Sequence, residues 1–177
     1  MSMIGNLRRL SDPDLRRLLA SPQMISSYLY ADEGDEGEER AAPEGFGPYA
    51  DIEIDKAWHG VHFLLTGDPE GGDFPLCFLM AGGTEIGDDD VGYGPARGFL
   101  SAEVKEIAAA LNTVDRDTLA ASFNWQKMAR AKIYPDIWSR RDEETGNREY
   151  LLDAFEAVRD FVTGAAEAGE AVIVYLN

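Results

Sequence analysis

The chain has 177 residues, one cysteine and a formal net charge of -17, with 33 Asp and Glu residues against 16 Lys and Arg residues. One cysteine excludes an intramolecular disulfide, no stretch approaches the ~20 apolar residues of a membrane span, and the acidic balance argues against duplex nucleic acid as a partner. A hydrophobic content of 45% fits a globular protein, and we expect a single domain over residues 1–177.

The first 30 residues predict a strand and two short helices. Residues 2–9 fit a short strand. Asp12 and Pro13 then begin a helix, and a second Ser-Pro signal predicts another from about Pro22 to Tyr30. The first residues, MSMIGNLRRLSDPD, contain no apolar signal core, so we expect a cytoplasmic protein.

Residues 31–48 break this pattern. Seven acidic residues and several glycines accompany one basic residue, Arg40, and no apolar anchor precedes Phe46. This composition predicts a solvated, mobile acidic loop. We favour a plain surface loop, and a role in binding a partner stays open.

Residues 54–66 predict a helix that ends at Gly67. At 100° per residue its apolar side chains form one continuous face. The rim of that face carries both histidines of the chain, together with Asp55 and Thr66; the histidines are His59 and His62.

The rest of the chain alternates apolar runs with acidic, glycine-rich loops. Strands are predicted at 75–81, where a short helix also fits, at 95–100 and at 171–176, the last one inside the sheet. Helices are predicted at about 101–111, 115–130 and 148–168. We therefore expect an α/β protein of α+β character, with a small mixed sheet of three to five strands flanked by about six helices.

Common catalytic and cofactor motifs are absent from the sequence. We find no glycine-rich phosphate loop and no GxSxG nucleophile motif, and Cys77 lies in an apolar run typical of a buried thiol. Asp55, His59 and His62 have a spacing that can place metal ligands on one helix face, but HExxH is missing. We predict no metal and no cofactor, and the sequence assigns no catalytic residue.

Five segments together resemble the YfbM-like proteins, a bacterial family of unknown function. These segments are Met3–Gly5, Asp55–Gly67, Gly92–Arg97, Ile133–Pro135 with Trp138, and Gly169–Tyr175. The resemblance implies a compact α/β domain and supplies no reaction. It also marks nine residues that we expect to contribute to one ligand-binding or partner-binding cleft: Asp55, Lys56, Trp58, His62, Thr66, Tyr93, Arg97, Tyr134 and Trp138.

Two functions fit these observations. The first is a non-enzymatic binding protein that neutralises a basic partner, for example as an immunity protein against a cationic toxin, because strong negative charge steers cations. The second is a small enzyme or ligand binder that uses a cleft around Asp55, His62, Arg97 and Tyr134, with His62 as general base and Asp55 as its orienting partner. We favour binding over catalysis.

Overall fold

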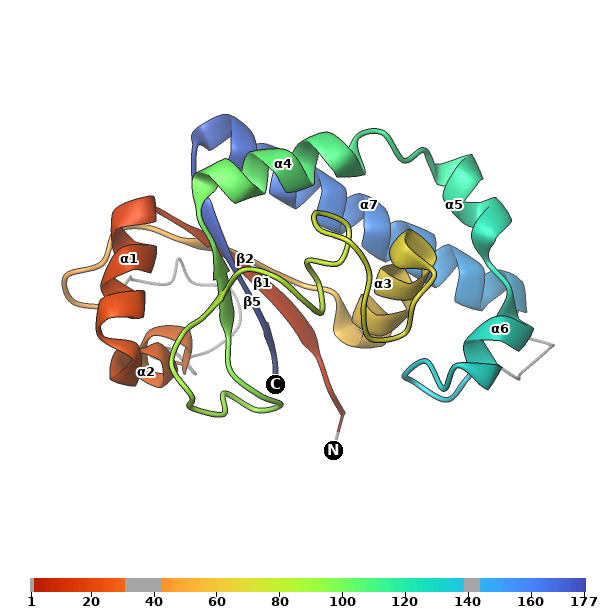
Figure 1. Cartoon of the computed structure of the whole chain (residues 1–177), viewed down its shortest axis with the longest axis horizontal. Coiled ribbons are helices and arrows are strands. Elements are labelled where there is room, and N and C mark those ends of the chain that lie inside the picture. Colours follow the sequence, from red (N-terminus) through yellow and green to blue (C-terminus); the bar gives the residue numbers. More distant parts are fainter. Residues whose placement is uncertain (1, 31–42, 139–143) are drawn as a thin grey trace.

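The core of the protein is one five-stranded antiparallel sheet (Figure 1). The computed structural model describes residues 2–30, 43–138 and 144–177. Within these ranges the strand order is β2-β1-β5-β4-β3. The strands are β1 (Gly5–Leu10), β2 (Ala50–Glu53), β3 (Thr84–Glu85), β4 (Arg97–Phe99) and β5 (Ala171–Leu176).

The predicted α/β class is confirmed, but the expectation of a mixed sheet is wrong. All four strand pairs are antiparallel. Strands β1 and β4 run in the same direction, because each is antiparallel to β5. They would form a parallel pair if they were neighbours, and β5 separates them.

Strand β5 occupies the centre of the sheet, as its apolar sequence predicted. Val172 and Val174 point into the core on one face, whereas Ile173 and Tyr175 point into the core on the other. A strand with apolar side chains on both faces needs a cover on each side. This requirement explains the two layers of helices.

Helices pack on both faces of the sheet (Figure 1). Helices α1 (Asp12–Ala20) and α2 (Ile25–Tyr30) cover one face. The other face packs against α3 (Trp58–Thr66), α4 (Ser101–Leu111) and α7 (Glu144–Ala168), and α5 (Arg116–Ser122) and α6 (Trp125–Arg130) lie beyond it. The described residues thus form seven α-helices, one more than expected, because residues 115–130 form two helices.

The segment 75–81 is not the strand that its apolar run predicted. It forms successive turns, in which the backbone N–H of Phe78 donates to Pro75 and that of Ala81 donates to Cys77. A short apolar run has no periodicity that separates a buried strand from a buried turn. The side chains of Cys77, Phe78 and Leu79 are all buried, so these consecutive residues are apolar without any alternation.

The break between α5 and α6 depends on Asn124. Its side-chain oxygen accepts a hydrogen bond from the backbone N–H of Lys127 at 2.8 Å, which caps the first turn of α6. The residue before it, Phe123, has extended backbone angles that end α5.

Replacing this cap should weaken the protein measurably. We expect Asn124→Ala to lower the free energy of unfolding by about 1 kcal/mol, because an N–H of the first turn loses its acceptor. Chemical denaturation measures the change. The control is Gln126→Ala, an exposed change on the same helix that should stay within about 0.5 kcal/mol of the parent. Equal effects of both variants would contradict the capping role.

None of the described helices is both long enough and apolar enough to cross a membrane. Most of the predicted acidic loop, residues 31–42, lies outside the described residues, so its character stays a prediction.

Candidate functional site

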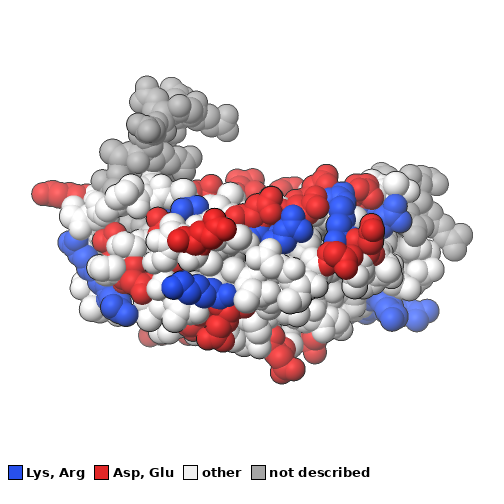
Figure 2. Space-filling model, turned by 90° about the horizontal axis from the view of Figure 1, so that it is seen from above, with Lys and Arg blue, Asp and Glu red and all other residues white. Residues whose placement is uncertain are grey.

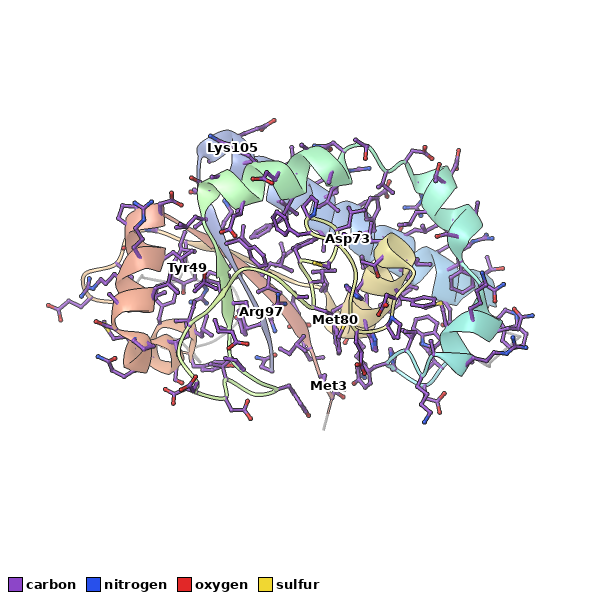
Figure 3. All side chains as sticks on the ribbon, viewed as in Figure 1. Met3, Tyr49, Asp73, Met80, Arg97 and Lys105 are labelled. Carbon is purple, nitrogen blue, oxygen red and sulfur yellow. The ribbon has the colours of Figure 1, made fainter. Side chains whose placement is uncertain are left out.

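A cavity of about 290 Å³ opens where the start of α3, the 75–81 turns and the β3–β4–β5 side of the sheet meet. The residues that define its chemistry are Trp58, Leu79, Met80, Glu85, Tyr93 and Arg97. Three of them, Trp58, Tyr93 and Arg97, belong to the nine residues expected to share a cleft. Figure 3 shows Arg97 and Met80 on neighbouring parts of the chain at this side of the molecule.

The guanidinium of Arg97 is fixed in the cavity wall by backbone carbonyls. Its Nη1 donates to Phe78 and Gly82, each at 3.1 Å, and its Nη2 donates to Leu79 at 2.8 Å. The carbonyls of Phe78 and Leu79 belong to the last of the 75–81 turns and that of Gly82 follows them, where the end of a helical segment leaves acceptors unpaired. Arg97 therefore holds the turns against the sheet.

The Arg97 cation has no carboxylate within ion-pair distance in the described part of the chain. Burial lowers the pKa of Arg97 to about 10, although the negative charge of Glu85 opposes this shift. Glu85 is the cross-strand neighbour of Arg97 in the β3–β4 pair, and both line the cavity. The site thus offers one fixed positive charge with an acidic group beside it.

Trp58, His59 and Tyr134 form a packed aromatic group beside the cavity. The Trp58 and Tyr134 rings stack with centroids 5.8 Å apart, and Trp58 Nε1 donates to the carbonyl of Met3 at 3.1 Å. The Tyr134 hydroxyl accepts from the backbone N–H of Met3. This group ties the segment before β1 to α3, and Tyr134 does not line the Arg97 cavity.

Both nitrogens of His59 have backbone partners. Nδ1 accepts from the N–H of Tyr134 at 3.0 Å, and Nε2 lies 2.7 Å from the carbonyl of Pro69, to which it donates. Burial lowers the pKa of His59, which keeps the ring neutral in this arrangement. His59 therefore joins two loops to α3.

His62 is completely buried. Its Nε2 lies 3.4 Å from the hydroxyl of Thr66, and its Nδ1 has no hydrogen-bond partner among the described residues. Burial, followed by repulsion from His59, lowers the pKa of His62 to about 4. His62 and Thr66 do not line the Arg97 cavity.

Asp55 bonds to a different helix and not to His62. It belongs to a 3-10 turn, Asp55–Ala57, that precedes α3, so the predicted helix 54–66 begins later than expected. The Asp55 carboxylate accepts from the hydroxyl of Tyr150 on α7 at 2.9 Å, and Lys56 follows it in the same turn. The structure shows no hydrogen bond between Asp55 and His62.

Trp138 is a core residue. It is 1% exposed, and its Nε1 donates to the carbonyl of Ile133 at 2.6 Å. No group of three or more His, Cys, Asp or Glu residues in the described ranges is placed to hold a metal ion.

Sequence reasoning missed Leu79, Met80 and Glu85 as cavity residues. Glu85 faces Arg97 only because β3 and β4 pair in one particular register. Strand β3 has two residues, which carry no alternation from which a register can be derived.

A five-stranded antiparallel sheet between two layers of helices defines a small α/β protein. The domain of unknown function DUF1877 matches residues 1–175, and the chain belongs to this family. The expected YfbM-like resemblance is confirmed. No match is found among curated proteins.

A solved structure supports the same fold. The chain is similar to YfbM from Escherichia coli, a protein of unknown function, with a TM-score of 0.73 and 20% sequence identity. The match covers 98% of this chain and 99% of that chain. At this identity the likeness shows the fold alone.

Proposed function

We propose that this protein binds a small ligand in the cavity at Arg97 and acts by binding rather than by catalysis. The observation that carries the proposal is the guanidinium of Arg97 in the wall of an otherwise largely apolar cavity, where it has no described carboxylate partner. Ligand sites commonly combine apolar walls with a few fixed polar groups. We also propose that the protein is cytoplasmic.

The state of His62 favours binding over the enzyme hypothesis. A general base works best when its pKa is near the working pH and when it can reach the substrate. His62 is fully buried and its pKa is about 4, so it meets neither condition. Asp55, its expected orienting partner, bonds to Tyr150.

Blocking the cavity tests this proposal. A panel of small amino acids and carboxylic acids is screened by thermal denaturation, since a ligand that binds only the folded state raises the melting temperature. We expect at least one compound to stabilise the parent and not Met80→Trp, whose larger side chain fills the cavity. Arg97→Lys, which keeps one charge but loses the fork of donors, should reduce the shift.

The matched control is Arg116→Lys, a change on α5 far from the cavity lining, where the arginine contacts three carboxylates. It should leave the ligand-induced shift unchanged. A panel in which no compound stabilises the parent, or one whose compounds stabilise Met80→Trp equally, would contradict the proposal.

A second proposal is that the protein binds a basic protein partner, as an immunity protein would bind a cationic toxin. The observation in its favour is the loop that follows β3, where Asp88, Asp89 and Asp90 are exposed and Tyr93 is 38% exposed. The loop is anchored, because Asp90 accepts from the N–H groups of Gly92 and Gly94. An exposed aromatic ring beside acids is a suitable anchor for a cationic surface.

The charge on another face gives less support to this partner. Figure 2 shows basic side chains beside the acidic ones over that face. The post-β3 loop is therefore the surface to test. We expect affinity capture from the native cell to retain a basic protein at low salt, and to lose it at high salt or with Tyr93→Ser. Capture of the same proteins by Tyr93→Ser would contradict this use of the loop.

A further inference from the structure

We infer that the ligand of the Arg97 cavity is a free amino acid with an apolar side chain, whose carboxylate binds Arg97 and whose ammonium group binds Glu85. This inference rests on the proposed function and names its ligand class. It depends on the unused donors of Arg97, on the position of Glu85 and on the apolar wall.

Arg97 retains a pair of donors suited to a carboxylate. A guanidinium has five N–H groups, and the three backbone carbonyls use two on Nη1 and one on Nη2. The Nε–H and the second N–H of Nη2 have no acceptor among the described residues. Arg8 uses the same two atoms to bind both oxygens of Asp51, at 2.7 and 2.8 Å.

Glu85 supplies the opposite charge at a suitable place. Residues directly opposite in an antiparallel pair have Cβ atoms about 4.5–5.5 Å apart, and their side chains lie on the same face. Glu85 is nevertheless exposed and forms no ion pair with a described residue, because the carbonyls of Phe78, Leu79 and Gly82 hold the Arg97 guanidinium. An α-amino acid carries its two charges one carbon apart and can contact both side chains.

The remaining cavity walls fit an apolar side chain, and the overall charge of the protein favours a ligand with no net charge. Leu79, Met80 and Trp58 offer apolar contacts, and about 290 Å³ is at the small end of the range for ligand pockets. A net charge of -17 repels anions, so a simple carboxylate would approach against the field of the protein. A zwitterion has no net charge and avoids this repulsion.

Three probes of similar shape separate the contributions of the two charges. They are L-leucine, 4-methylpentanoate, which lacks the amine, and 3-methylbutylamine, which lacks the carboxylate. In titration calorimetry we expect L-leucine to bind at least about tenfold more tightly than either analogue, since each analogue leaves one charge of the site unpaired.

Glu85→Gln is the decisive variant, because Glu85 is exposed and its change should not affect folding. It should weaken L-leucine binding to the level of 4-methylpentanoate and leave 4-methylpentanoate binding unchanged or stronger. Asp88→Asn, an exposed acidic residue of the post-β3 loop that does not line the cavity, is the matched control and should have no effect.

Two results would overturn the inference. In the first, 4-methylpentanoate binds as tightly as L-leucine and Glu85→Gln changes neither; the cavity then binds carboxylates, and the proposed function stands without the amino-acid assignment. In the second, none of the probes binds while other compounds of the panel stabilise the parent and not Met80→Trp. If no compound depends on the cavity, the proposed function itself fails.

Discussion

Acidification from pH 7 to pH 4 should lower the free energy of unfolding by roughly 3 kcal/mol, chiefly through His62. The ordinary pKa of histidine is 6.5, and that of folded His62 is about 4. Between these values the unfolded chain binds a proton that the folded protein does not bind. Stability is therefore fully present above pH 6.5 and is lost as the pH falls towards 4.

The variant His62→Leu isolates this effect. Nδ1 of His62 has no described partner and its Nε2 contact with Thr66 is long, so the apolar replacement removes few interactions at pH 7. We expect urea denaturation at pH 7, 5.5 and 4.5 to show a much smaller pH dependence in His62→Leu than in the parent. The remaining dependence comes from His59, whose pKa burial also lowers.

Two carboxylates contribute mainly below this pH range. Backbone hydrogen bonds lower the pKa values of Asp68 and Asp115 below their ordinary value of 3.8, so most of their contribution is lost below about pH 4. An equal loss of stability between pH 6.5 and 4 in His62→Leu and the parent would show that another group titrates there.

Arg8→Met should destabilise the protein by about 1–3 kcal/mol, the cost of leaving buried acceptors without a donor. Arg8 is 1% exposed and binds both oxygens of Asp51. It also donates to the carbonyls of Tyr28 and Leu29, near the end of α2. Methionine fills much of the space but leaves all these acceptors without the guanidinium.

Arg9→Met is the matched control, because Arg9 is the next residue of β1 and points to the opposite face. Its ion pair with Glu170 is only half-buried, and such pairs contribute at most about 1 kcal/mol. Chemical denaturation should therefore rank Arg8→Met well below Arg9→Met in stability. Similar losses for both variants would contradict the buried role of Arg8.

These two arginines illustrate what the sequence could predict. The segment 2–9 was expected to form a strand, and β1 lies at Gly5–Leu10. Alternation along a strand places Arg8 and Arg9 on opposite faces. Which of them is buried depends on α2, whose terminal carbonyls receive Arg8, and no local pattern contains that contact.

Elements with strong periodicity were predictable, and long-range contacts were not. The final helix and β5 were expected near their observed positions, and Gly67 ends α3 in a left-handed conformation as expected. The turns at 75–81 were missed because every residue there looks apolar. Arg97 holds these turns from 15 or more residues away along the chain.

The candidate cleft was also predictable only in part. The family resemblance marked Trp58, Tyr93 and Arg97, and the structure brings all three to one cavity. His62, Thr66 and Trp138 do not line it and have structural contacts, and Asp55 bonds to α7. Burial and strand register decide whether a residue lines the cavity or makes a structural contact, and both depend on the assembled fold. The use of the nine residues for binding stays a proposal.

The central position of β5 has a consequence for synthesis. Its hydrogen-bonded neighbours are β1, made among the first residues, and β4, so the sheet cannot assemble until residues 171–176 have left the ribosome. Until then β1 and β4 each have an unpaired edge, which can pair with another chain. A nascent chain of this protein therefore exposes these two strand edges until β5 is made.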